Sequence, residues 1–397
     1  MNILIKERAL TLNESKTVCI VIGSKKQKAE VSEELKRNPL LCGGFEMQEK
    51  QEDRWLGQQI SAQGLEDSIW KTIEAKEGKV KAAAREIATV VNDWRCQGAG
   101  GLQTAIMLWE ACCIPSILHG AGTWVEMGPR STRRLNKLQN WFLRLVLQVG
   151  PGTPLPALLW DQGMLDMEMR VWREKLVLAH HITGMDEESL ARQMYEEQLA
   201  QQWPGLAREV EEICDKLGIQ NVNSCRLDAK EFRKVVTSAC HAENEKRLRK
   251  QSENIKKCKS IKNEGYGKQE YIVKEKLYIG RKIFKARYGM TDFAGNFKNN
   301  LKFKKTGWLC ICKEEIEHEN HLLSGKCKVY GDINEKYKTK DDKSLMTFFE
   351  EVLTRRLELE EQVTMPGGGA TNTMIELATP AVASQLGGRN TQLAVNL

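Results

Sequence analysis

The chain has 397 residues and no long hydrophobic run. Its longest apolar stretches, 105–109 and 112–118, are interrupted by Glu110 and Pro115 and fall well short of the roughly 20 residues that a membrane-spanning helix needs. The amino terminus also lacks an apolar segment followed by small residues, which is the pattern of a secretory signal peptide. We therefore expect no membrane association and an intracellular location, in the nucleus or the cytoplasm.

The common catalytic motifs are absent as well. The sequence has no Gly-x-x-x-x-Gly-Lys-Ser/Thr loop for nucleotide phosphates and no His-Glu-x-x-His helix of a zinc protease. Asp341 and Asp342 are adjacent carboxylates, but lysines surround them without flanking apolar strands, so we expect a solvated loop rather than a two-metal centre. His180 and His181 are neighbours on a predicted helix and do not share a face. We therefore predict no complete active site.

Apolar residues are plentiful, at 41% of the chain, and they suffice for at least one hydrophobic core. The twelve cysteines are scattered over a lysine-rich sequence without a signal peptide. We therefore expect most of them to be free thiols that pack as small apolar groups, rather than disulfides.

Local patterns predict a mainly helical fold. Two short strands are expected at residues 17–23 and 54–60, which could pair but are too few for an independent sheet. Apolar residues recur at helical spacing over residues 65–94, a helix that Gly78 could divide. The next helix should cover residues 103–113 and end before Pro115, and Ser131 should cap the one after it. Further helices are expected at residues 165–182, 187–202, 206–217 and 344–362.

The positive charge is concentrated in residues 226–306, which hold 23 Lys and Arg against 9 Asp and Glu, whereas the whole chain has a net charge of +7. Such a cationic segment indicates a polyanion-binding surface, and interleaved aromatics such as Tyr266 and Tyr278 would allow bases to stack. The alternative is that this segment is a solvated linker without a binding role. The cations that we expect to bind nucleic acid are Lys246, Arg247, Arg249, Lys250, Lys256, Lys257, Lys259, Arg281, Lys282, Lys285, Arg287, Lys302, Lys304 and Lys305.

A cluster of cysteines and histidine gives the strongest site-like pattern. Cys310, Cys312, His321 and Cys327 supply three thiols and an imidazole, the ligands of a structural tetrahedral zinc site. His318 is a rival for the fourth position, and the single residue between the first two cysteines is a tighter spacing than usual. The alternative is a chance cluster of thiols in a folded turn. A zinc site of this type would stabilise the fold and leave no open position for catalysis.

Three short motifs follow one another in a defined order. Asn13 to Thr17 reads Asn-Glu-Ser-Lys-Thr, Trp55, Leu56 and Gly57 begin an aromatic-Leu-Gly-x-x-Ile strand, and a Pro-x-x-x-x-Gly stretch runs from Pro115 to Gly120. In this order and at these intervals they resemble the reverse transcriptases of non-long-terminal-repeat (LINE-type) retrotransposons, from just after the catalytic hairpin onward. The resemblance covers about residues 1–330.

The resemblance implies a carboxy-terminal part of such an enzyme. It assigns residues 54–60 to a primer-grip strand, the following helices to a thumb, and the cysteine cluster to the Cys-Cys-His-Cys knuckle of that family. The aspartate pair that binds Mg²⁺ in the full-length enzyme should lie just before Leu12, but only Glu7 is acidic there. We therefore expect this chain alone to be inactive as a polymerase. Its implied partners are the primer-template duplex, the element's RNA and possibly the missing amino-terminal polymerase part.

These observations divide the chain into expected parts. They are a palm remnant with a small two-stranded sheet (1–62), a thumb-like helical bundle (63–225), a basic nucleic-acid-binding segment (226–306), a zinc-knuckle-like module (307–332), a helix (333–364) and a disordered tail (365–397). The expected function is nucleic-acid binding. The alternative is a helical protein-interaction module, domesticated or degenerate, with a basic nuclear-import patch at residues 246–250.

Overall fold

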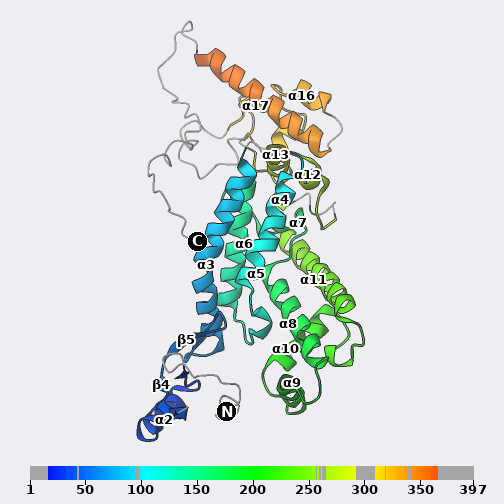
Figure 1. The fold of residues 1–397 in the computed structure, drawn as a ribbon. Helices are drawn as coiled ribbons and strands as arrows, with labels where there is room; N and C mark the ends of the chain where they lie inside the picture. Colours follow the sequence, from blue (N-terminus) through cyan, green and yellow to red (C-terminus); the bar gives the residue numbers. More distant parts are fainter. Residues whose placement is uncertain are drawn as a thin grey trace. The chain divides into compact units, whose positions relative to one another are not determined.

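A computed structural model of the chain describes residues 17–42, 44–93, 98–255, 257–258, 261, 265–291, 309–317, 319–337 and 341–364. The fold is mainly helical, as predicted, with small two-stranded sheets and a Cys/His cluster near residues 310–327 (Figure 1). The chain divides into two compact units, Met1–Phe349 and Glu350–Leu397. The expected tail at 365–397 lies outside the described residues. Within the described ranges no helix is long and apolar enough to cross a bilayer.

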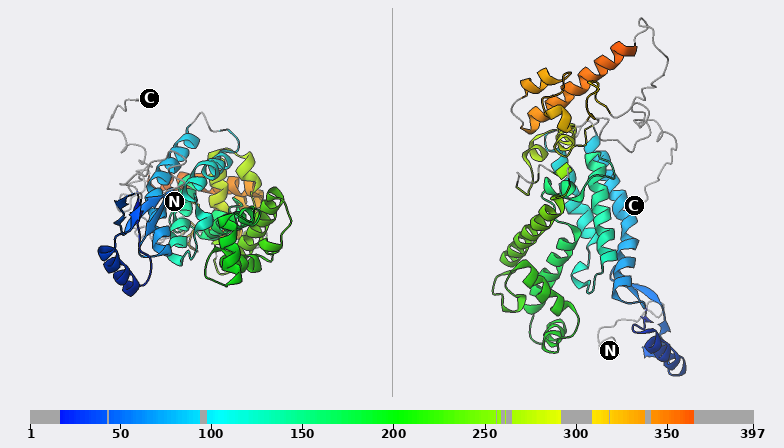
Figure 2. Two further views of the ribbon diagram at one scale, coloured as in Figure 1. Left: turned by 60° about the horizontal axis from the view of Figure 1, so that its bottom comes forward. Right: turned by 180° about the vertical axis from the view of Figure 1, so that it is seen from behind.

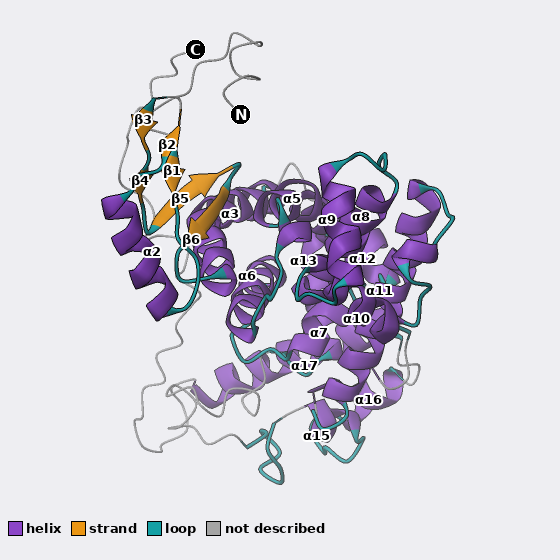
Figure 3. Cartoon of the chain, turned by 90° about the horizontal axis from the view of Figure 1, so that it is seen from below, coloured by secondary structure: helices purple, strands orange, loops and turns teal. Residues whose placement is uncertain are grey.

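The strands form three separate pairs beside helix α2 (Lys25–Arg37), as Figure 3 shows. β1 (Val18–Cys19) pairs in parallel with β4 (Gln48–Glu49), and β2 (Leu41–Cys42) pairs antiparallel with β3 (Phe45–Glu46). β5 (Glu52–Trp55) pairs antiparallel with β6 (Gln58–Ser61). The expected pairing of residues 17–23 with 54–60 is therefore wrong, because each segment has a different partner.

The stretch expected as one strand at residues 54–60 is instead a hairpin. Leu56 and Gly57 form its two-residue turn with φ of 45° and 83°, and Trp55 pairs with Gln58 across it. Two consecutive residues in the left-handed region match the twist of an antiparallel hairpin. Of the primer-grip-like residues, Trp55 therefore ends β5, and Leu56 and Gly57 form the turn that follows it.

Helix α3 (Leu65–Asn92) confirms the periodicity of residues 65–94. Ile73, Val80 and Val91 are buried along one face, as the spacing of three, four and seven predicts. Gly78 does not divide the helix, because it lies on the exposed side, where a Cβ would meet open space.

A π-helical turn separates the next two helices. α4 (Gly101–Leu108) continues into the π-helix η3 (Trp109–Cys113) and then into α5 (Ile114–Ile117). The expected helix end before Pro115 is wrong. Pro115 occupies the first turn of α5, where a missing N–H is tolerated, and the wider π turn precedes it.

Helix α6 (Pro129–Leu147) is capped by a residue far away in the sequence. Glu66 of α3 accepts hydrogen bonds from Gly128 N at 2.6 Å and from Ser131 N and Oγ at 3.3 and 3.0 Å. The expected capping role of Ser131 is therefore wrong, because Gly128 occupies the N-cap and Glu66 supplies the acceptor.

Further helices complete the described fold (Figure 2). They are η4 (Ala121–Thr123), α7 (Leu155–Trp160), α8 (Met167–Thr183), α9 (Leu190–Ala200), α10 (Leu206–Leu217), η5 (Val222–Ser224), α11 (Ala229–Ser252), α12 (Glu270–Lys274), α13 (Leu277–Arg287), α15 (Glu319–Leu323), α16 (Gly331–Lys336) and α17 (Asp342–Thr364).

The basic segment contributes to the core. Tyr271, Phe284 and Tyr288 are at most 4% exposed and pack with side chains from α3 to α7. Phe232 and Val236 of α11 pack in a second cluster with α8, α9 and α10. The expected boundary at residue 225 is therefore not observed, because α11, α12 and α13 complete the bundle rather than leave it as a linker.

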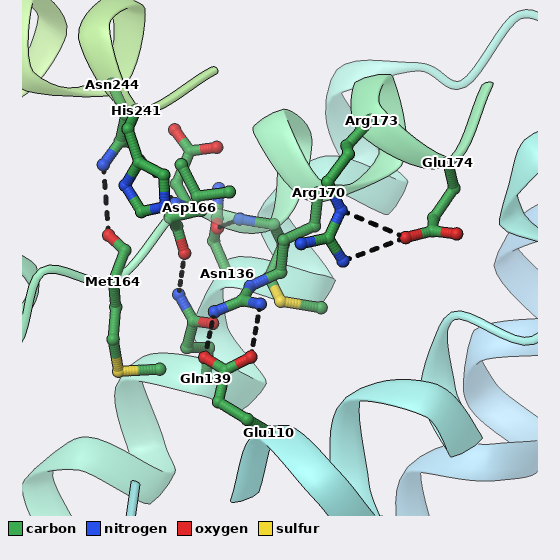
Figure 4. A network of polar contacts seen from close by, with 12 residues as sticks. Glu110, Asn136, Gln139, Met164, Asp166, Arg170, Arg173, Glu174, His241 and Asn244 are labelled. Atoms are coloured by element: carbon green, nitrogen blue, oxygen red, sulfur yellow. Dashed lines mark hydrogen bonds and ion pairs between the residues drawn. The ribbon is translucent and has the colours of Figure 1, made fainter. Parts of the chain in front are cut away.

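Buried polar groups fix the helices in register. The Arg170 side chain is 3% exposed and binds both oxygens of Glu110 in η3, at 2.7 and 2.5 Å (Figure 4). In the same region Asn244 of α11 donates to Met164 O at 3.1 Å and accepts from Asp166 N. These contacts link η3, α8 and α11, because each buried polar group is satisfied by a different element.

A second polar contact joins α13 to α7. Asp161 is fully buried and accepts from Arg287 Nε at 2.9 Å, from Tyr271 at 2.8 Å and from Tyr288 at 2.6 Å. Burial raises the pKa of Asp161, and the guanidinium and the two hydroxyls act against that shift. A buried charge with this many donors holds its neighbours in one arrangement.

Candidate metal centre and cationic surface

The two closely spaced cysteines lie on a tight turn. An antiparallel bridge joins Leu309 and Ile316, and within it Lys313 N donates to Cys310 O and Cys310 N donates to Glu315 O, both at 2.8 Å. The one-residue spacing between Cys310 and Cys312 is therefore accommodated by the turn. His321 is on α15, and Cys327 follows it after Gly325.

The ligand atoms of Cys310, Cys312, His321 and Cys327 all lie within 4.8 Å of one another. Cys310 Sγ is 3.7 Å from Cys327 Sγ, and Cys312 Sγ is 3.3 Å from His321 Nε2. In a tetrahedral site with metal–sulfur bonds of ~2.3 Å and metal–nitrogen bonds of ~2.0 Å, these separations are about 3.8 and 3.5 Å. The four residues can therefore hold one metal ion. His318, the rival ligand, lies outside the described residues.

The thiols differ in acidity. Burial raises the pKa of Cys310 and of Cys327. Burial acts in the same direction on Cys312, but hydrogen bonds from the N–H groups of Glu314 and Glu315 and from neighbouring thiols outweigh it, so its pKa is lowered. A thiolate, the ligand form, is therefore favoured first at the residue that faces the imidazole.

Glu315 also contributes to the candidate metal site, and sequence reasoning missed it. Its Oε2 lies 3.1 Å from His321 Nδ1, so it can accept a hydrogen bond from the Nδ1–H group, which directs the Nε2 lone pair toward Cys312. A carboxylate in this position orients a ligand histidine. In the sequence Glu315 is one of several glutamates between Cys312 and His321, and nothing there distinguishes it from the others.

The predicted cations fall into several groups. Lys246, Lys250 and Lys282 are exposed, and Lys257 and Lys285 are half-buried. Arg247 lies over Trp172 and pairs with Glu168 and Glu243, and Arg249 lies over Trp160 and pairs with Glu245. Lys256, Lys259, Lys302, Lys304 and Lys305 lie outside the described residues.

Two predicted nucleic-acid contacts need correction. The Arg287 side chain is 4% exposed and bound to Asp161, so it stabilises the core. Arg281 is also buried and donates to Val146 O and to Asn92 Oδ1, and burial lowers its pKa to about 10.

Several aromatic residues of the segment are buried as well. Tyr278 is exposed, but Tyr271, Phe284 and Tyr288 are buried and cannot stack on bases.

The exposed cations at the start of α11 surround a hollow between α8 and α11, which sequence reasoning did not single out. Its volume is about 1050 Å³, and its floor includes the His180 ring stacked on Phe232 at 4.2 Å. Lys230, Arg233 and Lys234 line it, and within the described part of the chain none of the three forms an ion pair. The sequence feature that could have revealed this group is its i, i+3, i+4 spacing, which places the three cations on one side of a helix.

Two of the three resemblance motifs contact each other. Gln58, next to the Trp55–Gly57 turn, binds His119 O through its amide nitrogen and accepts from Trp124 Nε1 at 2.8 Å. Gly120 has φ of 78°, a conformation that favours glycine, and a Cβ there would push the Gln58 side chain out of its present position. Trp55 and Leu56 are 64% and 71% exposed at the turn itself.

We also compared the chain with protein-family models, with curated proteins and with solved structures, and nothing matched it.

Proposed function

We propose that this chain binds nucleic acid through phosphate contacts, as the carboxy-terminal part of a non-LTR retrotransposon reverse transcriptase would, and that it does not polymerise by itself. The observation that carries the proposal is the hollow between α8 and α11 with three cations that form no ion pair with any described residue. Exposed cations without acidic partners attract phosphates and discriminate little between sequences. RNA and DNA strands are therefore the proposed ligands, which fits the positive excess of residues 226–306.

The test is the salt dependence of binding. The wild-type chain should bind a fluorescent 20-nucleotide duplex with an affinity that falls log-linearly with salt, because bound cations displace counterions. Replacing Lys230, Arg233 and Lys234 by Gln should lower the slope by up to about three, since each phosphate contact contributes about one. Fluorescence anisotropy over a salt series gives both values.

A matched control variant loses the same number of positive charges at positions outside the hollow. Lys26, Lys36 and Arg208 are exposed on α2 and α10, and their replacement by Gln should leave the slope nearly unchanged. Equal effects of the two triple variants would contradict the role of the hollow. Absence of binding by the wild-type chain would reject the proposed function itself.

We further propose that the metal of the Cys/His cluster is zinc and that it is structural. The donor set and the separations suit tetrahedral zinc, and four protein ligands leave no open position. The full chain, purified under reducing conditions, should contain about one zinc by elemental mass spectrometry. His321→Ala and Cys327→Ser should lose it.

Two substitutions serve as zinc controls. Cys112 is an exposed thiol outside the cluster, so Cys112→Ser should keep the metal. His318→Ala should also leave the stoichiometry near one. If His318→Ala and His321→Ala behave alike, or if the wild-type chain carries no metal, the zinc proposal fails.

One observation favours the alternative, a protein-interaction module. Leu190 and Met194 of α9 are 70% and 56% exposed, and Trp203 after the helix is 54% exposed. Exposed apolar side chains that gather on one element are typical of interaction surfaces. A salt response that stays flat in the binding test would place this alternative ahead of nucleic-acid binding.

A further inference from the structure

A second cationic groove lies between α3 and α6, far in sequence from the basic segment. These two helices pack against each other over much of their length (Figures 1 and 2). The groove has a volume of about 520 Å³. Its lining residues are Trp70, Glu77, Lys81, Arg130, Arg133, Arg134, Lys137, Leu138 and Trp141.

The cations follow one side of α6. Arg130, Arg133, Arg134 and Lys137 recur at intervals of three and four, so they project along the same edge of the helix. Leu135, Leu138 and Phe142 point instead into the core and are at most 2% exposed. The cationic edge therefore has a fixed direction relative to the bundle.

Two indole rings hold the guanidinium groups in place. The guanidinium carbons of Arg130 and Arg134 lie 3.6 and 4.2 Å from the centre of the Trp70 ring. At the other end, Arg85 and Lys81 lie 5.6 and 5.9 Å from the ring of Trp141. Because cation–π contacts restrain long side chains, less conformational entropy is lost when an anion binds.

The charges in the groove are not balanced. Arg134 pairs with Glu74 and Glu77, and Lys81 pairs with Glu77. Arg85, Arg130, Arg133 and Lys137 form no ion pair among the residues that the structure describes. The charge of Arg130 does act on the nearby Asp67 carboxylate. Six cations therefore face three carboxylates. The amino-terminal N–H groups of α6 are already bound by Glu66, so an anion would meet side-chain cations and not the helix end.

We propose that the groove between α3 and α6 binds a single strand of nucleic acid through its phosphodiester backbone. From Arg130 to Trp141 the helix rises about 16 Å, at 1.5 Å per residue. This length spans several consecutive phosphates of one extended strand, each of which carries one negative charge. The excess of three cations suits such a chain of charges better than one isolated phosphate. Guanidinium groups also bind phosphate oxygens in pairs.

This inference rests on the proposed function, because it names a second contact region for the same ligand class. The inference goes beyond the proposed function because it places a nucleic-acid strand on α3 and α6, outside residues 226–306. A ligand that reaches both regions would be bound at two separate surfaces of one bundle.

The test uses the full chain and a fluorescent 12-nucleotide oligo(dT). Arg130→Gln combined with Arg133→Gln and Lys137→Gln should weaken binding at least tenfold and lower the salt slope by two to three. Replacing Trp70 by Ala keeps every charge but releases Arg130 and Arg134, so it should weaken binding several-fold, and Trp70→Phe should restore most of the loss. A general charge effect would leave both Trp70 variants like the wild type.

Lysine protection gives a measurement that needs no variant. In the wild-type chain the oligonucleotide should slow acetylation of Lys81 and Lys137, and it should leave exposed Lys26 unchanged, as peptide mass spectrometry would show. If the wild type binds oligo(dT) but the groove variants and lysine protection show no effect, the inference is overturned while the proposed function stands. Equal protection by a 12-residue polyglutamate would indicate an acidic-peptide site and would also overturn it.

Discussion

At the scale of single residues, Lys76 has a side-chain pKa well below the usual value for lysine. Its Nζ donates to His119 O at 2.9 Å, next to the contact between Gln58 and the segment 115–124. Burial, with a smaller contribution from nearby Arg54, lowers the pKa of Lys76 from 10.5 to about 8. The charged ammonium therefore costs folding free energy below pH 8, and this cost decreases as the pH rises toward 10.5, because only the unfolded chain then stays protonated.

We expect two consequences for Lys76. After reductive ¹³C-methylation, its NMR signal should titrate near pH 8, and Lys76→Arg should remove that signal. In urea unfolding, any stability that Lys76→Met gains over the wild type should be largest below pH 8 and should shrink by pH 10. A difference between the two proteins that is independent of pH would contradict the shift.

At the scale of elements, one buried carboxylate connects α7 to α12 and α13. We expect Asp161→Asn to lower the free energy of unfolding by about 3–5 kcal/mol, because it leaves the buried Arg287 guanidinium without a counter-charge. Urea denaturation monitored by circular dichroism measures this loss. The exposed Asp215→Asn should change stability by less than about 0.5 kcal/mol. Similar values for both variants would mean that the contact of Asp161 with Arg287 contributes little.

The elements that the sequence predicted well are those with a clear apolar period. α3 and α10 were recognisable because their buried residues recur at helical spacing. The β5–β6 turn was missed because Leu56, at φ 45°, is not a turn-forming residue and only Gly57 signalled it. In α13 the dense lysines and arginines concealed the buried Ile283 and Phe284, so a core helix was taken for part of a basic nucleic-acid-binding segment.

Prediction of the candidate sites depended on distance along the chain. The ligands Cys310 to Cys327 are close in sequence, so their types and spacing sufficed to group them. The hollow and the groove combine residues of helices that are distant in sequence, such as Trp70 with Arg130, and tertiary packing alone brings them together. The orienting contact of Glu315 with His321 could not be predicted although the two residues are close in sequence, because it depends on the geometry of the turn.

At the scale of the whole molecule, the main core depends on residues that are widely separated in the sequence. Leu102 and Phe142 lie in the same cluster as Leu277, Phe284 and Tyr288. A ribosome that adds about 5–20 residues per second needs about 7 to 28 s more to reach residue 288 after residue 147. During that interval the early helices expose the apolar surface that α12 and α13 later cover. The nascent chain is therefore most vulnerable to aggregation, and most in need of a chaperone, while residues 148–288 are being added.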